Sequence, residues 1–222
     1  MAQIRALALA LAIAAPAVHG AGGHHAVDDA FLLDAGQCEF ESWFERESGG
    51  ARNLLHAGLG CRVGPVELGV AGDRQRMSGA PATTTVSPQV KWARQLDARW
   101  SAGVVLSAMW QTGAEGRYQG STVLVPVSWR LRDDLALHVN AGRDFVAHEQ
   151  GANRTGIAAE WAPLPSVSLL AERFRQGRVD YWRLGGRWSV APGWSVDLSR
   201  AAGVRGGAAP WWTLGVTRSL GS

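Results

Sequence analysis

The sequence predicts an all-β fold, a closed antiparallel transmembrane β-barrel of about 12 strands preceded by a signal peptide. The clearest segment runs from Trp100 to Trp110, where apolar residues such as Val104 and Leu106 alternate with small or polar ones. Ten residues at about 3.3 Å each, tilted by about 40°, rise about 25 Å, which is the height of the apolar band of an outer-membrane barrel. Similar segments recur, and the links between them alternate between short and long, as periplasmic turns and external loops do.

The N-terminal region is typical of a signal peptide over residues 1–20. Arg5 precedes an apolar run at 6–15 and small residues at 16–21, and cleavage fits after either Gly20 or Ala17. No later stretch offers the run of about 18 apolar residues that a transmembrane helix needs. We expect residues 21–35 to form a periplasmic arm and residues 36–222 to form one barrel domain.

Twelve strand segments follow in order, each bounded by turn residues. The even count places both termini of a bacterial barrel on the periplasmic side. Long links are expected at 73–85, 113–120, 143–153 and 201–209, and short ones at 64–65, 96–97, around 133, 163–165 and 191–193. The first external link, Gly49–Gly50, is an exception to the alternation. The segments begin near Gln37, Asn53, Val66, Gln89, Arg99, Thr122, Leu135, Thr155, Val167, Tyr181, Trp194 and Trp211.

Tryptophans cluster near the ends of these segments and predict two aromatic belts at the lipid–water interfaces. The alternative is that large aromatic side chains simply suit strand positions in any β-protein. The periplasmic belt comprises Trp92, Trp100, Trp129, Trp161 and Trp194, and the external belt comprises Trp110, Trp182 and Trp212, with Trp43 added.

The two cysteines fall opposite each other if Gly49 and Gly50 form a two-residue hairpin turn. The same register places apolar pairs on one face of the hairpin. In an oxidising periplasm, a Cys38–Cys61 disulfide is then expected near the periplasmic rim, with a stabilisation of about 3 kcal/mol from loop entropy. The alternative is two free thiols that face lipid.

The opposite strand faces carry polar and charged residues of both signs, which predicts a polar lumen. These side chains either line a water-filled channel or pair across the lumen and close it. The inward-facing set comprises Glu39, Glu41, Glu45, His56, Glu67, Lys91, His138, Asn140, Arg154, Glu160, Glu172, Arg183, Arg187 and Asp197. Within it, Glu160 and Glu172 facing Arg154, Arg183 and Arg187 form the predicted lumen charge cluster.

No arrangement of residues argues for an enzyme or a cofactor. The sequence lacks a GxSxG nucleophile turn and an HExxH metal motif. His24 and His25, with Asp28 and Asp29, offer metal-ligand types, but a flexible polar arm is the favoured interpretation, so no metal site is predicted. The formal net charge of +3 is spread among acids, which argues against nucleic acid as a partner.

Several stretches resemble a family of outer-membrane transporters associated with meta-pathway phenol degradation. The resemblance rests on HHAVDDAFLLDAGQCEFESWFER at the start, then SPQVKWAR, LHVNAGRDF, TGIAAEW and SLLAERF. It implies a closed outer-membrane barrel and passage of small organic molecules. The final stretch, TLGVTRSLGS, is similar to a barrel-assembly signal, although Arg218 stands where an aromatic residue is usual and two residues follow Leu220.

The sequence therefore predicts a bacterial outer-membrane protein that passes small solutes, with membrane lipid and the barrel-assembly machinery as partners. The main alternative is a closed barrel with a structural or surface-interaction role, sealed by arginine–carboxylate pairs. An envelope enzyme acting on lipid and a soluble periplasmic β-protein are weaker alternatives.

Overall fold

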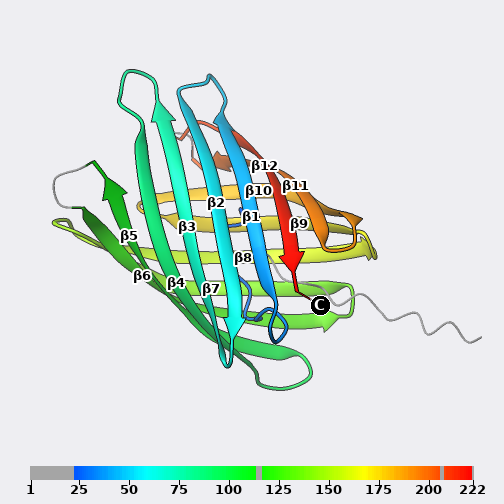
Figure 1. Ribbon diagram of the computed structural model, residues 1–222. Helices are drawn as coiled ribbons and strands as arrows, with labels where there is room; N and C mark the ends of the chain where they lie inside the picture. Colours follow the sequence, from blue (N-terminus) through cyan, green and yellow to red (C-terminus); the bar gives the residue numbers. More distant parts are fainter. Residues whose placement is uncertain (1–22, 114–116, 206–207, 222) are drawn as a thin grey trace, which may run out of the picture.

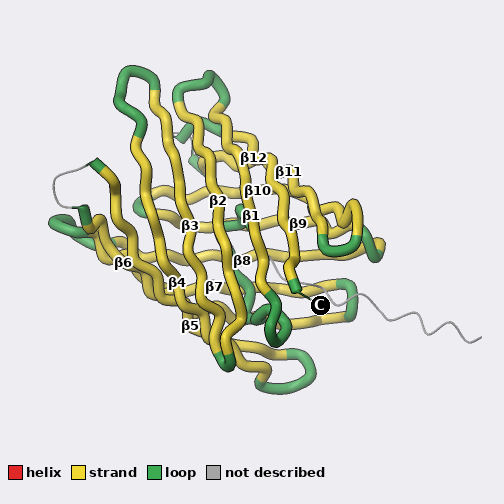
Figure 2. Tube along the Cα trace, viewed as in Figure 1, coloured by secondary structure: helices red, strands yellow, loops and turns green. Residues whose placement is uncertain are grey.

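The computed structural model describes residues 23–113, 117–205 and 208–221, which form one closed antiparallel β-barrel (Figures 1 and 2). Each strand pairs with its neighbours in sequence, and β1 closes the barrel against β12. The strands are β1 Cys38–Glu47, β2 Arg52–Val63, β3 Val66–Met77, β4 Thr83–Gln95, β5 Trp100–Thr112, β6 Tyr118–Arg132, β7 Leu135–Val146, β8 Ala152–Leu164, β9 Val167–Gln176, β10 Val179–Ala191, β11 Trp194–Gly203 and β12 Trp211–Leu220. The predicted fold class and strand number are confirmed. The predicted signal peptide at 1–20 lies outside the described residues.

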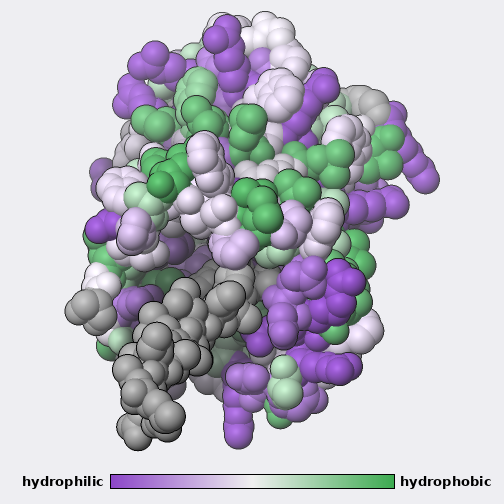
Figure 3. Space-filling model, turned by 90° about the vertical axis from the view of Figure 1, so that its right-hand side faces the viewer, coloured by the Kyte–Doolittle hydropathy of each residue, from purple (hydrophilic) through white to green (hydrophobic). Residues whose placement is uncertain are grey.

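The barrel has an apolar outer face and a polar inner face, as the alternating sequence predicts. Two adjacent residues of β10 show the difference between the faces: the outward-facing Leu184 is 56% exposed, whereas the inward-facing Arg183 is 4% exposed. On the face seen in Figure 3, hydrophobic side chains run across the middle of the wall, with hydrophilic side chains gathered above and below them. Such a surface is stable only where something other than water covers its apolar band.

The strands extend further into the predicted long loops than the sequence suggests. β3 continues to Met77 and β4 starts at Thr83, so their link is 78–82 rather than 73–85. The link between β7 and β8 is likewise 147–151 rather than 143–153. The polar ends of these strands lack apolar alternation, yet their backbone hydrogen bonds remain paired with the neighbouring strand. Turn residues and hydrophobicity therefore mark the apolar band better than they mark strand ends.

The predicted belt tryptophans lie on the outer face near the strand ends. Seven of the eight are exposed, and Trp129 stacks on Trp100 with ring centroids 5.2 Å apart. Trp43 was wrongly assigned to the external belt, because it shares the inward-facing side of β1 with Glu41 and Glu45. Its ring stacks on His56 at a centroid distance of 3.4 Å.

The predicted Cys38–Cys61 disulfide is present and joins β1 to β2, with Cα atoms 4.0 Å apart. The two cysteines are direct cross-strand partners, as a turn at Gly49–Gly50 requires. Both glycines have positive φ values, 99° and 74°, which an L-residue rarely adopts. The hairpin register is therefore set by the turn and covalently fixed at its other end.

Candidate functional site

The N-terminal arm, residues 23–37, enters the barrel, where residues 23–33 are buried or half-buried, whereas residues 34–36 are exposed. Its dark-blue trace passes between the barrel walls before β1 begins (Figure 1). Val27 is fully buried in a cluster with Ala158, Phe174, Ala201 and Trp211, all from the inner wall. The sequence placed this arm, as residues 21–35, in the periplasm as a flexible polar segment. The described part of the arm is instead packed in the lumen, because its apolar residues find a partly apolar patch there.

The wall makes room for the arm at Gly156 on β8. A Cβ atom at this position would lie 2.5 Å from Cγ2 of Val27, well inside van der Waals contact. The absence of a side chain thus lets the arm approach the strand backbone. A glycine at position 156 is therefore needed for the arm to pack against β8 in this position.

Carboxylates and a hydroxyl of the wall accept hydrogen bonds from the arm backbone. The N–H groups of Ala26 and Val27 donate to the Glu172 carboxylate, and the Val27 bond to Oε2 is 2.9 Å long. The N–H of Ala30 donates to Oγ of Ser128 at 2.8 Å. Arg183 donates to the carbonyl of His24. An extended arm with unpaired backbone groups therefore remains satisfied inside the lumen.

Lys91, the only lysine in the sequence, holds the paired aspartates of the arm. Its Nζ lies 3.1 Å from Oδ1 of Asp28 and 3.0 Å from Oδ1 of Asp29, and its side chain is nearly buried. Burial of a charged amine is costly unless it is paired, so Lys91 and the arm stabilise each other.

The two aspartates of the arm differ in their electrostatic environment. Burial raises the pKa of Asp28 despite the neighbouring Lys91. For Asp29, burial acts in the same direction but is outweighed by Lys91, by His138 and by the N–H of Phe31, which together lower its pKa. Asp29 therefore stays ionised more readily than Asp28, although both carboxylates contact Lys91 at nearly the same distance.

The five residues of the predicted charge cluster all face the lumen but divide among separate partners. Arg183 contacts Glu172 at 3.1 Å, whereas Arg187 contacts Asp197 at 2.7 Å. Arg154 contacts Asp144 at 3.0 Å. Glu160 lies 3.6 Å from Nε2 of His138 and is fully buried. The pairs Arg183–Glu172 and Arg187–Asp197 each join direct cross-strand neighbours and do not belong to one central network.

A second polar group lines the lumen between β1, β2 and β3, beside Trp43, whose ring contacts both His56 and His24 of the arm. His56 contacts Asp73 at 2.7 Å and Glu41 at 3.5 Å. Arg52 contacts Glu45 at 2.7 Å nearer the β1–β2 turn. The inner wall therefore carries both signs of charge in close pairs along its length.

One group of side chains within the described residues has metal-binding character. His24 and His25 of the arm meet Asp197 of β11, and their ligand atoms lie within 4.8 Å of one another. The sequence had grouped the two histidines with Asp28 and Asp29 instead. Those aspartates turn toward Lys91, and the third candidate ligand comes from a distant strand that only the closed barrel brings close.

Comparisons with known proteins give a family and a fold. The sequence profile of the family described as "Uncharacterised conserved protein UCP029691" matches residues 9–220. No curated protein matches the sequence.

Three solved structures illustrate the likeness in fold. A KdgM porin has 9% identity and a TM-score of 0.67, covering 82% of this chain and 99% of its own. A NanC porin has 11% identity and the same TM-score, covering 82% of this chain and 100% of its own. The CymD monoaromatic hydrocarbon channel has 9% identity and a TM-score of 0.54, covering 86% of this chain and 90% of its own. At these identities the likeness concerns the barrel itself.

Proposed function

The chain belongs to the family described as Uncharacterised conserved protein UCP029691, and we propose that it is an outer-membrane channel for small solutes whose N-terminal arm closes the lumen. The observation that carries this proposal is a closed, largely polar inner wall occupied by a segment that is not part of the wall. Departure of the arm would free the space that it fills in the lumen, and water can replace the polar contacts that hold it.

The outer face supports a location in the bacterial outer membrane. Exposed apolar side chains surround the barrel between tryptophans at both strand ends, which suits a lipid environment. Insertion by the barrel-assembly machinery belongs to the same proposal, with β12 as the recognised strand. Membrane lipid is then the permanent partner of the outer face.

The likeness in fold to porins and a hydrocarbon channel supports passage of solutes rather than enzymatic activity. The resemblance of the sequence to transporters associated with phenol degradation supports small organic molecules as the solutes. The paired charges of the wall favour solutes that tolerate a polar path.

The arm also favours a second candidate function, a sealed barrel with a structural or surface-interaction role. In that case the arm and the arginine–carboxylate pairs close the lumen permanently. The two functions differ in whether loosening the arm allows ions to pass.

Conductance of the refolded protein in a planar bilayer separates these functions. Lys91→Met removes the positive charge that holds Asp28 and Asp29, and Lys91→Arg is the matched control that retains it. For a channel we expect rare openings in the wild type, more frequent or longer ones in Lys91→Met, and near wild-type behaviour in Lys91→Arg. Heat-modifiable gel mobility verifies folding of each variant. A folded Lys91→Met barrel that passes no ions would favour the sealed barrel.

A further inference from the structure

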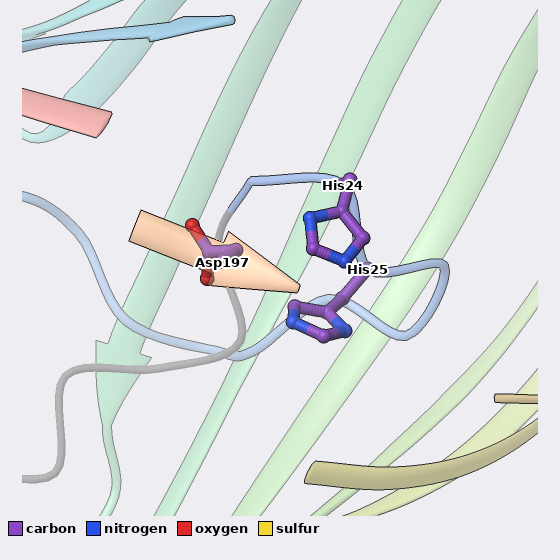
Figure 4. Close-up of side chains that lie close together, drawn as sticks. All are labelled: His24, His25 and Asp197. Atoms are coloured by element: carbon purple, nitrogen blue, oxygen red, sulfur yellow. The ribbon is translucent and has the colours of Figure 1, made fainter. Parts of the chain in front are cut away.

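His24 and His25 meet Asp197 at the contact between the arm and β11 (Figure 4). The two imidazole rings lie beside each other on the arm, with centroids 4.4 Å apart, and the carboxylate comes from the strand. We propose that these three side chains bind one divalent transition-metal ion of the zinc class, which fastens the arm to the barrel wall.

Ring nitrogens of both histidines are available to bind a metal ion. Within the described part of the chain, Nδ1 of His24 and Nε2 of His25 are buried and lack a hydrogen-bond partner, and Nδ1 of His25 has only the Glu172 carboxylate nearby, at 3.8 Å. A buried polar atom without a partner is costly, so its retention calls for a ligand. Two neutral imidazoles and a carboxylate are a common ligand set for zinc.

Neighbouring groups orient the two rings. Nε2 of His24 contacts Oγ of Ser199 at 2.7 Å, which leaves Nδ1 free to bind a metal. Nδ1 of His25 lies 3.8 Å from the Glu172 carboxylate, so its Nε2 is the freer nitrogen. Hydrogen bonding at the other ring nitrogen is the usual way in which metal-binding histidines are held.

The charge around Asp197 is compatible with an added cation. Nε of Arg187 contacts Oδ1 of Asp197, whereas Oδ2 is the oxygen nearer to the arm at Gly23. Besides Asp197, the carboxylates of Glu160 and Glu39 also act on Arg187. Arg183 also acts on His24 and is paired with Glu172. The four carboxylates near the site thus outnumber the two arginines, and the excess offsets part of the charge of a bound ion.

The distances require a small adjustment. Ligand atoms around one tetrahedral zinc ion, with bonds of about 2.0–2.1 Å, lie about 3.3 Å apart. The three ligand atoms lie within 4.8 Å of one another. A movement of up to about 1.5 Å by the side chains of His24 and His25 would close the difference.

Zinc binding by the refolded whole protein tests the proposal. After dialysis against Zn²⁺, we expect one EDTA-removable ion per chain, and Co²⁺ should give the visible spectrum of a site with histidine ligands. His24→Gln and His25→Gln should each weaken binding by about tenfold or more. Neither variant alters a strand, so loss of binding is separable from loss of the barrel. His148→Gln, in the β7–β8 link, is the matched control and should bind like the wild type.

Absence of a stoichiometric ion in the folded wild type would overturn the metal site, as would binding that survives the His24→Gln/His25→Gln double variant. The measurement does not depend on conductance. A barrel that binds zinc but does not conduct even after EDTA removes the ion and Lys91→Met loosens the arm would refute the channel and leave the metal site standing.

Discussion

Gly156→Ala should expel the arm without changing the barrel. The added Cβ would lie 2.5 Å from Cγ2 of Val27, so the arm must shift by about 1 Å or more to regain van der Waals contact. Overpacking of this kind typically costs about 1–3 kcal/mol, which multiplies the population with the arm released by about five- to 150-fold. Gly72→Ala on β3 is the matched control, because its Cβ would meet only the Thr85 carbonyl oxygen, at 3.7 Å.

Thiol labelling measures that release. Both native cysteines are in the disulfide, so a cysteine placed at Ala30, which is buried in the docked arm, is the reactive thiol. Its modification rate should rise by the stated factor in Gly156→Ala and stay constant in Gly72→Ala. Val27→Ala removes the clashing methyl groups, so adding Gly156→Ala to it should cost little more. Unchanged labelling in Gly156→Ala, or costs that simply add in the double variant, would refute the steric argument.

Four further outcomes are expected. Asp29→Asn should release the arm more than Asp28→Asn in the same labelling assay, because Asp29 is the more readily ionised partner of Lys91. Replacing both Cys38 and Cys61 by serine should lower the free energy of unfolding by about 3 kcal/mol, measured by urea titration in lipid vesicles. Leu106→Arg, midway between two belt tryptophans, should lower it by about 2–4 kcal/mol in the same titration. If the metal site exists, Zn²⁺ at 100 times its Kd should suppress arm release about 100-fold, and EDTA should restore it.

Strand register and facing were predictable from the sequence because they depend on local rules. A side-chain period of two sets which residues face the lumen, and the glycine turn sets the partner of Cys38. Arg183 and Glu172 are direct cross-strand partners for this reason, and they lie 3.1 Å apart. Arg187 was grouped with Glu160 and Glu172, yet it pairs with Asp197, its direct neighbour on β11. The sequence identified the face of each charge but not always its partner.

The position of the arm was not predictable by those rules, because no strand periodicity governs it. Its docking depends on how wide the closed barrel is and on which wall residues meet in the lumen. Two signals are visible in retrospect. The arm carries consecutive aspartates in a chain with a single lysine, and it carries Val27 and Ala30 among its polar residues. Neither signal predicts where the arm lies, because that depends on the positions of Lys91 and Gly156 in the closed barrel.

The composition of the arm–wall contact favours a removable plug over a permanent core. Barrels of eight strands are filled by their own side chains, and those of 16 to 18 leave an aqueous channel, so twelve strands enclose more space than side chains fill. A permanent filling would be mainly apolar, because buried ion pairs contribute little net stability. Here the apolar contact centres on Val27, and charged wall residues that include Lys91, Glu172 and Arg183 make polar contacts with the arm. Water can solvate all three of these wall groups once the arm leaves, and Glu172 and Arg183 keep each other as partners. The wall is therefore suited to both states, which a purely structural seal would not require.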